Sequence, residues 1–189
     1  TPWDENLPVE GGVKYMGNIA MYVVDTQNAA DIREGTTSIA DGFNSSYLSG
    51  YALPTALRRI GDDALRSYSL STLLLPERLE EIGEEAFYNN QQLTKVTLNE
   101  KLKEVGDYAF SGCTGLTSIN IPESVTSIGV SAFKNCSSLK TIIFPSKITT
   151  IEYGTLYGCT GISSITIPDG VTSIGDYSFN GCISLISVT

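Results

Sequence analysis

Residues 116–138 read LTSINIPESVTSIGVSAFKNCSS, and the chain is built by repeating this pattern. LTKVTLNEKLKEVGDYAFSGCTG and LSTLLLPERLEEIGEEAFYNNQQ precede it, while LKTIIFPSKITTIEYGTLYGCTG and ISSITIPDGVTSIGDYSFNGCIS follow it. The apolar residues that open successive repeats are each 23 positions apart: Leu70, Leu93, Leu116, Leu139, Ile162 and Leu185. A fixed period of this length with an L-x-x-L-x-L core predicts a leucine-rich repeat solenoid.

The positions within one repeat have separate structural roles. The first, fourth and sixth residues are Leu116, Ile119 and Ile121. Because side chains alternate along a strand, we expect the fourth and sixth to point inward and the third and fifth outward. The seventh residue is proline in four of the five full repeats, and proline ends a strand ladder because it has no N–H to donate. A second apolar pair, Val125 and Ile128, predicts another short strand.

The second half of the repeat is expected to turn the coil and close its core. Gly129, which recurs as Gly83, Gly106 and Gly175, is expected to turn the chain with a positive φ. Phe133 then enters the core, and Cys136 closes the coil. One coil buries too little apolar surface to offset the entropy of ordering its backbone, so coils must stack with strands ~4.8 Å apart.

The repeats divide the chain into a lead-in and a solenoid. Residues 1–31 are expected to form an irregular lead-in with a short strand near residues 19–25. Residues 32–189 are expected to form the solenoid, with degenerate repeats at 32–47 and 48–69 and full repeats from residue 70. We interpret both ends as cut, with a signal peptide removed from the first and a repeat truncated at Thr189.

Composition excludes several classes of function. The net charge of −9 argues against nucleic acid and anionic membrane surfaces as partners, since both attract Lys and Arg. No apolar run approaches the roughly 20 residues that span a bilayer, so membrane insertion is not expected. The absence of histidine removes Ser-His and Cys-His nucleophile pairs and the commonest zinc ligand.

The acidic residues follow the repeat instead of forming a catalytic pair. The eighth position holds Glu77, Glu100, Glu123 and Asp169, and the fifteenth holds Glu84, Asp107 and Asp176. Repetition places such residues along a solvated edge, where Arg78, Lys101 and Lys147 relieve their repulsion. A weak cation site is the alternative. Phosphate-loop, EF-hand and dinucleotide motifs are absent, so we predict no enzyme, cofactor or metal site.

The cysteines also share one repeat position. They are Cys113, Cys136, Cys159 and Cys182, spaced 23 residues apart. Their side chains are expected to point the same way into the coil, and parallel Cβ vectors suit a disulfide poorly. Buried free thiols are therefore the favoured interpretation. A disulfide or a metal site remains as an alternative.

The order I-P, V-x-x-I-G, A-F and G-C resembles the BspA-like (Treponema pallidum type) leucine-rich repeat family, over about residues 13–189. The resemblance implies a right-handed solenoid with a curved parallel β-sheet on its concave face. It also implies a secreted or surface protein of host-associated bacteria, some of whose relatives adhere to host matrix proteins or to other bacteria. The sequence departs from the pattern at Asn90, Asn99, Glu152 and Leu156, where we expect looser local geometry.

Residues that point outward are the candidates for partner binding. Most third and fifth positions are small and hydroxylated, which suits a flat sheet. Leu74 and Ile143 are apolar there and could seed a contact patch with Lys95 and Asn120. Tyrosines near the A-F turn suit protein interfaces and sugar stacking. The tyrosines selected as candidates are Tyr108, Tyr153 and Tyr177.

These observations predict a non-enzymatic binding or adhesion module outside a bacterial cell. An extended solenoid sheet would present a large surface to a protein partner, such as a host matrix protein or another cell surface. A carbohydrate-binding surface protein is the first alternative, and it requires several exposed aromatic rings in one plane. A passive spacer between the cell and another domain is the second.

Overall fold

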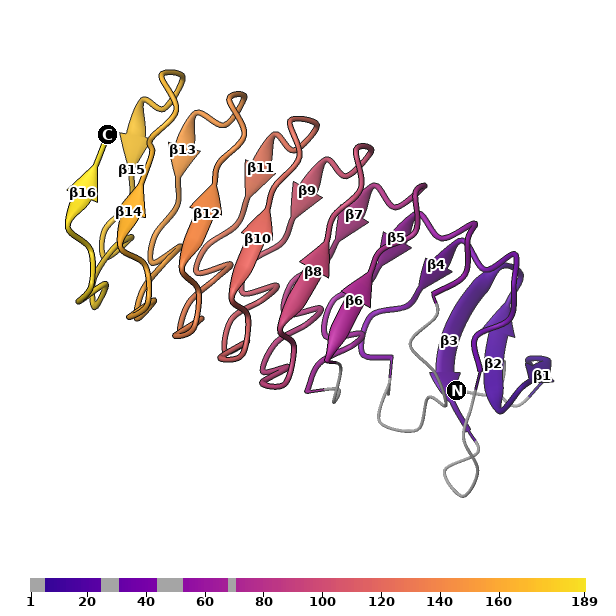
Figure 1. Cartoon of the computed structure of the whole chain (residues 1–189). Coiled ribbons are helices and arrows are strands. Elements are labelled where there is room, and N and C mark those ends of the chain that lie inside the picture. The colour runs from indigo at the N-terminus through magenta and orange to yellow at the C-terminus, as the bar shows by residue number, and fades with distance from the viewer. Residues whose placement is uncertain (1–5, 25–30, 44–52, 68–70) are drawn as a thin grey trace.

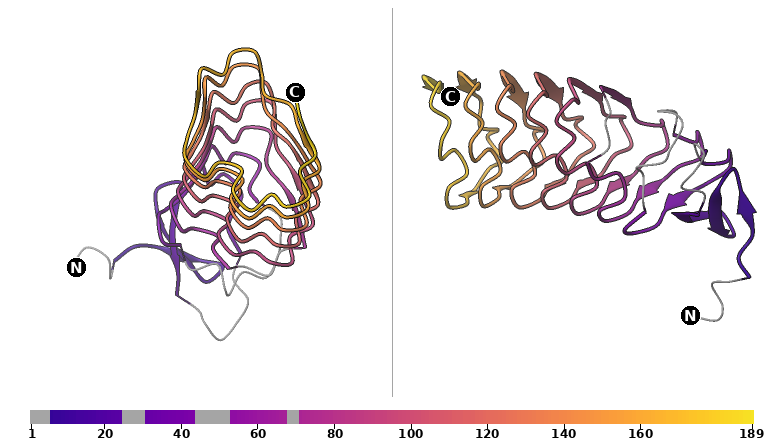
Figure 2. Two further views of the ribbon diagram at one scale, coloured as in Figure 1. Left: turned by 90° about the vertical axis from the view of Figure 1, so that its left-hand side faces the viewer. Right: turned by 90° about the horizontal axis from the view of Figure 1, so that it is seen from below.

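The computed structural model describes residues 6–24, 31–43, 53–67 and 71–189. The chain winds into a solenoid whose coils stack along one axis (Figure 1). Seen along that axis, the coils lie almost in superposition (Figure 2, left). The predicted leucine-rich repeat solenoid is therefore confirmed.

Each full repeat contributes one strand to each of two ladders, and the two earlier coils contribute β4 and β5 to the second. The first ladder contains β6 (Thr72–Leu74), β8 (Lys95–Thr97), β10 (Ser118–Asn120), β12 (Thr141–Ile143), β14 (Ser164–Ile165) and β16 (Ser187–Val188). The second contains β4 (Ser38–Ile39), β5 (Arg59–Ile60), β7 (Glu81–Ile82), β9 (Glu104–Val105), β11 (Ser127–Ile128), β13 (Thr150–Ile151) and β15 (Ser173–Ile174). Both strands expected in each repeat are thus present.

Neighbouring strands pair in parallel and in register within four sheets: β6-β8-β10-β12 and β14-β16 in the first ladder, and β4-β5-β7-β9-β11 and β13-β15 in the second. In the first ladder, Ile119 pairs with Ile142, and in the second Ile128 pairs with Val105. Both pairs are 23 residues apart, so equivalent residues of neighbouring coils lie side by side. The expectation that Ile-Pro segments form neighbouring strands is confirmed.

An antiparallel hairpin covers the N-terminal end of the second ladder (Figure 1). It consists of β1 (Val9–Glu10), β2 (Val13–Met16) and β3 (Ile19–Val23), with β2 antiparallel to both neighbours. β3 then pairs in parallel with β4, which joins this hairpin to the repeats. The hairpin therefore supplies the first coils with a paired neighbour.

The core is a set of columns that run along the solenoid. The strands of the first ladder bury their fourth-position residue between two exposed ones, as in β10 and β12. The Phe87 and Phe110 rings stack with centroids 5.2 Å apart, and the Phe110 and Phe133 rings stack at 5.7 Å. Leu156 takes the next place in this column and is fully buried. Offset aromatic stacking adds to the stability gained from burial.

The four cysteines form a second column of buried, unpaired thiols. Each Sγ donates to a main-chain carbonyl of the preceding coil; for example, Cys136 Sγ lies 3.2 Å from Phe110 O, and Cys159 Sγ 3.0 Å from Phe133 O. Burial raises the pKa of Cys113 to about 12, so this thiol is protonated at neutral pH and is a poor nucleophile. The column is part of the core.

The glycines of the second ladder serve a different purpose from the one expected. Gly129 and its equivalents lack a positive φ, so that expectation is wrong. A Cβ on Gly106 would lie 2.5 Å from the carbonyl carbon of Gly83, which shows that these positions bring two backbones together. The positive φ occurs two residues later, at Glu85, Tyr108, Ser131, Gly154 and Tyr177. Glycine is selected here for close approach.

At two positions where the sequence departs from the repeat pattern, an asparagine side chain makes hydrogen bonds to the main chain. Asn90 Nδ2, at the cysteine position, donates to Leu65 O and to Phe87 O, both at 2.9 Å. Asn99, at the proline position, accepts from Lys101 N at 2.7 Å and donates to Pro76 O at 2.8 Å. At both asparagines the side chain bonds main-chain groups of its own coil and of the preceding coil, so hydrogen bonds hold the backbone at these two departures.

Replacing Asn90 by cysteine is expected to raise the free energy of unfolding by about 1 kcal/mol. Asn90 Oδ1 is buried and lacks a hydrogen-bond partner among the described residues, and cysteine removes this atom while keeping a donor. Urea denaturation measures the change. Asn90→Ala is the matched control, which leaves Leu65 O without that donor and should be less stable than Asn90→Cys. A cysteine variant less stable than the wild type would contradict this account.

Candidate protein-interaction surface

The outward face of the first ladder carries four of the predicted site residues. These four are terminal residues of their strands, and their side chains are exposed: Leu74, Lys95, Asn120 and Ile143. Leu74 is 73% exposed and Ile143 is 62% exposed, which is unusual for large apolar side chains on an otherwise polar sheet. We call this surface the first-ladder face.

Leu74 and Ile143 do not form one patch. Strand order in the sheet is β12-β10-β8-β6, so two strands separate them. In register, the row across the sheet reads Leu74, Thr97, Asn120 and Ile143. At a strand spacing of ~4.8 Å the two apolar side chains are about 14 Å apart. Each must therefore be considered as a separate contact point.

Leu74 borders a hollow with a volume of about 960 Å³. Its lining combines apolar side chains with hydroxyls and one pair of opposite charges: Leu53, Thr55, Ala56, Thr72, Leu74, Leu75, Pro76, Glu77 and Arg78. Apolar walls with a few polar groups are typical of binding sites. Sequence reasoning identified Leu74 but not this hollow, because its walls come from two different coils.

Ile143 borders a smaller hollow of about 310 Å³. Its lining includes Glu123, Ser146 and Pro168. The Glu123 carboxylate accepts from Ser146 N and Ser146 Oγ, and these bonds lower the pKa of Glu123 below its usual value. The Glu123 carboxylate already accepts hydrogen bonds from the next coil. The smaller hollow therefore offers a partner fewer unoccupied hydrogen-bonding groups.

The three predicted tyrosines lie elsewhere, on the turns that follow the second ladder. Tyr108 is half-buried, whereas Tyr153 and Tyr177 are 48% and 57% exposed. The rings of Tyr153 and Tyr177 meet edge to face, with centroids 5.6 Å apart and planes at 65°. The seven predicted residues are thus divided between two surfaces, and this tyrosine pair is not a flat stacking platform.

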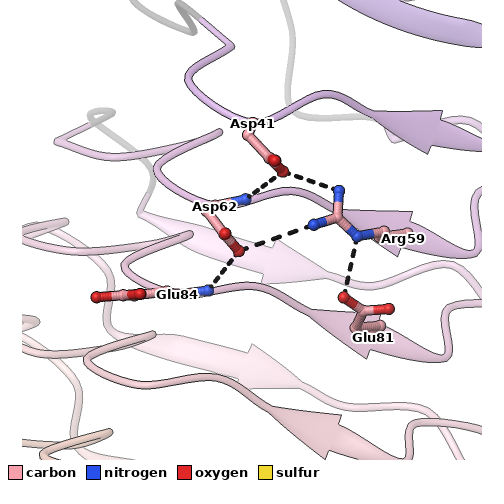
Figure 3. A network of polar contacts seen from close by, with 5 residues as sticks. All are labelled: Asp41, Arg59, Asp62, Glu81 and Glu84. Carbon is pink, nitrogen blue, oxygen red and sulfur yellow. Dashed lines mark hydrogen bonds and ion pairs between the residues drawn. The ribbon is translucent and has the colours of Figure 1, made fainter.

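An arginine-centred network joins the first coils along the second ladder (Figure 3). Arg59 contacts Asp41 and Glu81 at 2.9 Å each and lies 3.8 Å from Asp62. Asp41 and Asp62 also accept backbone N–H groups of the next coil, at 3.0 and 2.9 Å. These carboxylates therefore act as structural links between successive coils.

The pKa values of two carboxyl groups in this network, Asp41 and Glu84, are shifted in opposite directions. The N–H of Asp62, together with Arg59, lowers the pKa of Asp41. Burial, followed by the charges of Asp107 and Asp62, raises the pKa of Glu84. No group of three or more His, Cys, Asp or Glu residues in the described part of the chain could hold a metal ion.

Asp41→Asn and Glu84→Gln are expected to change stability with opposite sign at neutral pH. Because the pKa of Asp41 is lowered on folding, its contribution is present above its ordinary value of 3.8 and disappears as pH falls through the folded value. Because the pKa of Glu84 is raised, its contribution is present below 4.5 and disappears as pH rises through the folded value. Urea midpoints at pH 7 should thus fall for Asp41→Asn and rise or stay level for Glu84→Gln.

The same measurement at about pH 3 provides the control, because this pH lies below the ordinary pKa values of both carboxyl groups, so the unfolded chain carries most of the protons there. The difference between each variant and the wild type should then shrink. A difference that stays constant from pH 7 to pH 3 would show that neither ionisation contributes to stability.

Comparison with known proteins places these features in a family. A model of the BspA type leucine rich repeat region matches in six copies, over residues 6–94 and 58–186. No curated protein sequence matches the chain. In the described residues, no helix has the length and apolar character needed to cross a bilayer.

Solved structures share the fold. The T. pallidum leucine rich repeat protein is 26% identical, with a TM-score of 0.81 over 89% of this chain and 82% of that one. A leucine-rich repeat protein from Bacteroides ovatus is 27% identical, with a TM-score of 0.71 over 97% of this chain and 50% of that one. A leucine rich cell surface protein from Faecalibacterium prausnitzii is 24% identical, with a TM-score of 0.51 over 89% of this chain and 58% of that one.

This chain spans about half the length of the Bacteroides protein. The family match covers nearly all of the sequence, and the pairs that join β7 to β9, β9 to β11 and β10 to β12 are each offset by 23 residues. The chain belongs to the BspA-type leucine-rich repeat family.

Proposed function

We propose that this chain is a non-enzymatic binding module that presents the first-ladder face to a protein partner. The observation that carries the proposal is Leu74, a strongly exposed leucine at the border of an apolar hollow of about 960 Å³. Leucine-rich repeat proteins generally bind proteins, and this family is typically non-enzymatic. A partner side chain that enters this hollow would bury apolar surface next to a polar rim, as in protein interfaces.

The module acts, in this proposal, on the outside of a bacterial cell. The similar Faecalibacterium protein is described as a cell surface protein, which supports the location. The partner would be a host matrix protein or a protein on another cell. An extended sheet with small residues around one apolar anchor suits a large, flat protein surface better than a small molecule.

The alternatives receive less support from the molecule. Carbohydrate binding by the tyrosines needs coplanar rings, and the Tyr153–Tyr177 planes differ by 65°. A passive spacer does not require an exposed leucine beside a hollow. The first-ladder face therefore remains the surface to test.

Leu74→Asp is expected to weaken binding to the partner at least ~10-fold, since an anchor residue in a hollow carries much of an interface's free energy. The protein would be assayed against immobilised collagen, laminin and fibronectin and against intact bacterial cells, by surface plasmon resonance or cell capture. Ser164→Asp, on the same face but distant from the hollow, introduces the same charge and should leave binding within ~2-fold.

Three results would contradict the proposal. Equal losses for Leu74→Asp and Ser164→Asp would mean that charge, and not the hollow, controls binding. An unchanged affinity for Leu74→Asp would exclude the hollow. No binding to any surface would favour the spacer.

A further inference from the structure

Both ladders are interrupted next to the same coil, which consists of residues 139–161. In the described part of the chain, β11 pairs with β9 and β13 with β15, but β11 and β13 do not pair. In the first ladder β12 pairs with β10 and β14 with β16, but β12 and β14 do not pair. The second ladder is thus interrupted before this coil and the first ladder after it. We call residues 139–161 the joint coil.

Main-chain hydrogen bonds beside the second ladder show the same interruption. In the coil before the joint coil, Thr126 N donates to Lys103 O at 2.9 Å. In the coil after it, Thr172 N donates to Thr149 O at 2.8 Å. Among the described residues, no equivalent bond joins Thr149 N to Thr126 O. The junction before the joint coil therefore lacks a row of bonds that its neighbours have.

Glu152 explains the interruption of the second ladder. It occupies the repeat position of Gly129 and Gly175. A Cβ on Gly129 would lie 2.5 Å from Asp107 N, and a Cβ on Gly175 would lie 2.5 Å from Tyr153 N. Glu152 carries such a Cβ, so its backbone cannot approach the preceding coil as closely as a glycine does. Strand pairing is lost at the coil where glycine is missing.

The interruption of the first ladder coincides with a larger core residue. Phe144 is buried at the sixth repeat position, and an oversized core side chain pushes the backbone around it apart. The other full repeats and the coil after Phe144 have a smaller residue there: Leu75, Leu98, Ile121 and Ile167. Lys140 N donates to Thr117 O at 2.9 Å, whereas Ser163 N makes no equivalent bond to Lys140 O among the described residues. The hollow of about 310 Å³ that Ile143 borders includes residues of both coils at this junction.

A third row of hydrogen bonds, in the turns that follow the second ladder, continues through both junctions. Phe133 N donates to Thr155 O at 3.0 Å before the joint coil, and Leu156 N donates to Ser178 O at 2.8 Å after it. The β10–β12 pair also crosses the first junction, and the β13–β15 pair crosses the second. Each junction therefore keeps two of its three rows, and the joint coil stays attached on both sides.

We propose that the joint coil is a flexing point built into the solenoid. The second ladder opens between β11 and β13 while the row of turn bonds acts as the hinge. The coils that follow residue 139 thereby change their direction relative to the coils that precede it. Segments held by fewer hydrogen bonds open at a lower free energy than the rest of a structure. This inference does not depend on the proposed protein partner.

Hydrogen exchange of the whole chain, resolved for each amide by nuclear magnetic resonance, tests the proposal. The protection factors of the Thr149 and Glu152 amides should be at least ~10-fold lower than those of the equivalent Thr126 and Gly129 amides, because a main-chain hydrogen bond is missing at each. Relaxation dispersion should show exchange on the μs–ms timescale in β13 that is absent from β9.

Three variants separate the causes of the two interruptions. E152G should raise the protection of the Thr149 amide at least ~10-fold and suppress the exchange of β13, because the two backbones can then approach. E152A is the matched control, which removes the carboxylate but keeps the Cβ, and it should behave as the wild type does. F144L should raise the protection of the Ser163 amide and leave that of Thr149 unchanged.

Three outcomes would overturn the proposal. Equal protection of the Thr149 and Thr126 amides in the wild type would show that the second ladder is closed. Equal gains for E152G and E152A would mean that the carboxylate, and not the Cβ, separates the coils. A β13 without μs–ms exchange would mean that the gap is a fixed spacing and that the joint coil does not flex.

Discussion

Phe133→Ala is expected to lower the free energy of unfolding by ~3–5 kcal/mol, the usual cost of removing a buried aromatic side chain. Phe133 is fully buried and stacks on Phe110 in the column that joins successive coils. The cavity cannot collapse easily, because the coils above and below are held in register by both ladders. Urea denaturation followed by circular dichroism measures the change.

Phe179→Ala is the matched control for Phe133→Ala. Phe179 occupies the same repeat position but is only partly buried. Folding therefore removes less of its apolar surface from water, and the alanine variant loses less burial. Its loss should be clearly smaller than that of Phe133. A change under about 0.5 kcal/mol for Phe133→Ala would mean that this ring does not hold the coils together.

Gly106→Ala is expected to have the second largest effect, a loss of at least about 2 kcal/mol. A Cβ at this position would lie 2.5 Å from Gly83 C and 2.7 Å from Glu84 N. Both are backbone atoms of the preceding coil, so no side chain can move aside to make room. The coils must separate locally, which weakens the second ladder next to β9 and β7.

Gly170→Ala provides the control, because its Cβ would meet only Ser146 O at 3.0 Å and Ile148 O at 3.5 Å, on an exposed turn. Thermal and urea unfolding should show a much smaller change there. If Gly106→Ala were as stable as Gly170→Ala, close backbone approach would not be the reason for glycine in the second ladder.

Much of the fold could be predicted because one residue type serves one role in every coil. The period of 23, the strand before the proline, and the inward Ile119 and Phe133 all follow from pattern and alternation. The second ladder also follows, from the pair Val125 and Ile128. In-register stacking then makes like residues neighbours, so the columns of phenylalanine and cysteine could be anticipated before any coordinates.

The prediction from sequence was wrong where one residue type can satisfy two different structural requirements. Glycine suits both a positive φ and a close backbone approach, and the sequence does not distinguish these. The structure assigns Gly106 and Gly129 to close approach, and places the positive φ at residues such as Tyr108 and Ser131. An asparagine in place of cysteine looks like a defect in the pattern, although Asn90 makes the hydrogen bonds that the coil requires.

The candidate surfaces were harder to predict because they depend on neighbouring coils. Leu74 was recognisable as an apolar residue at an outward position, yet its hollow is formed with residues about twenty positions earlier, such as Leu53. Such sites are visible only when the coils are stacked, since no single repeat contains them.

The in-register stack of coils is best tested by nuclear Overhauser contacts in solution. For the paired strands of the full repeats, we expect contacts between residues 23 positions apart, such as Ser118 with Thr141 in the first ladder and Ser127 with Glu104 in the second. The rings of Phe110 and Phe133 should also show mutual contacts. Contacts at another offset between these full repeats, or none between these rings, would contradict the account of the fold and of the first-ladder face.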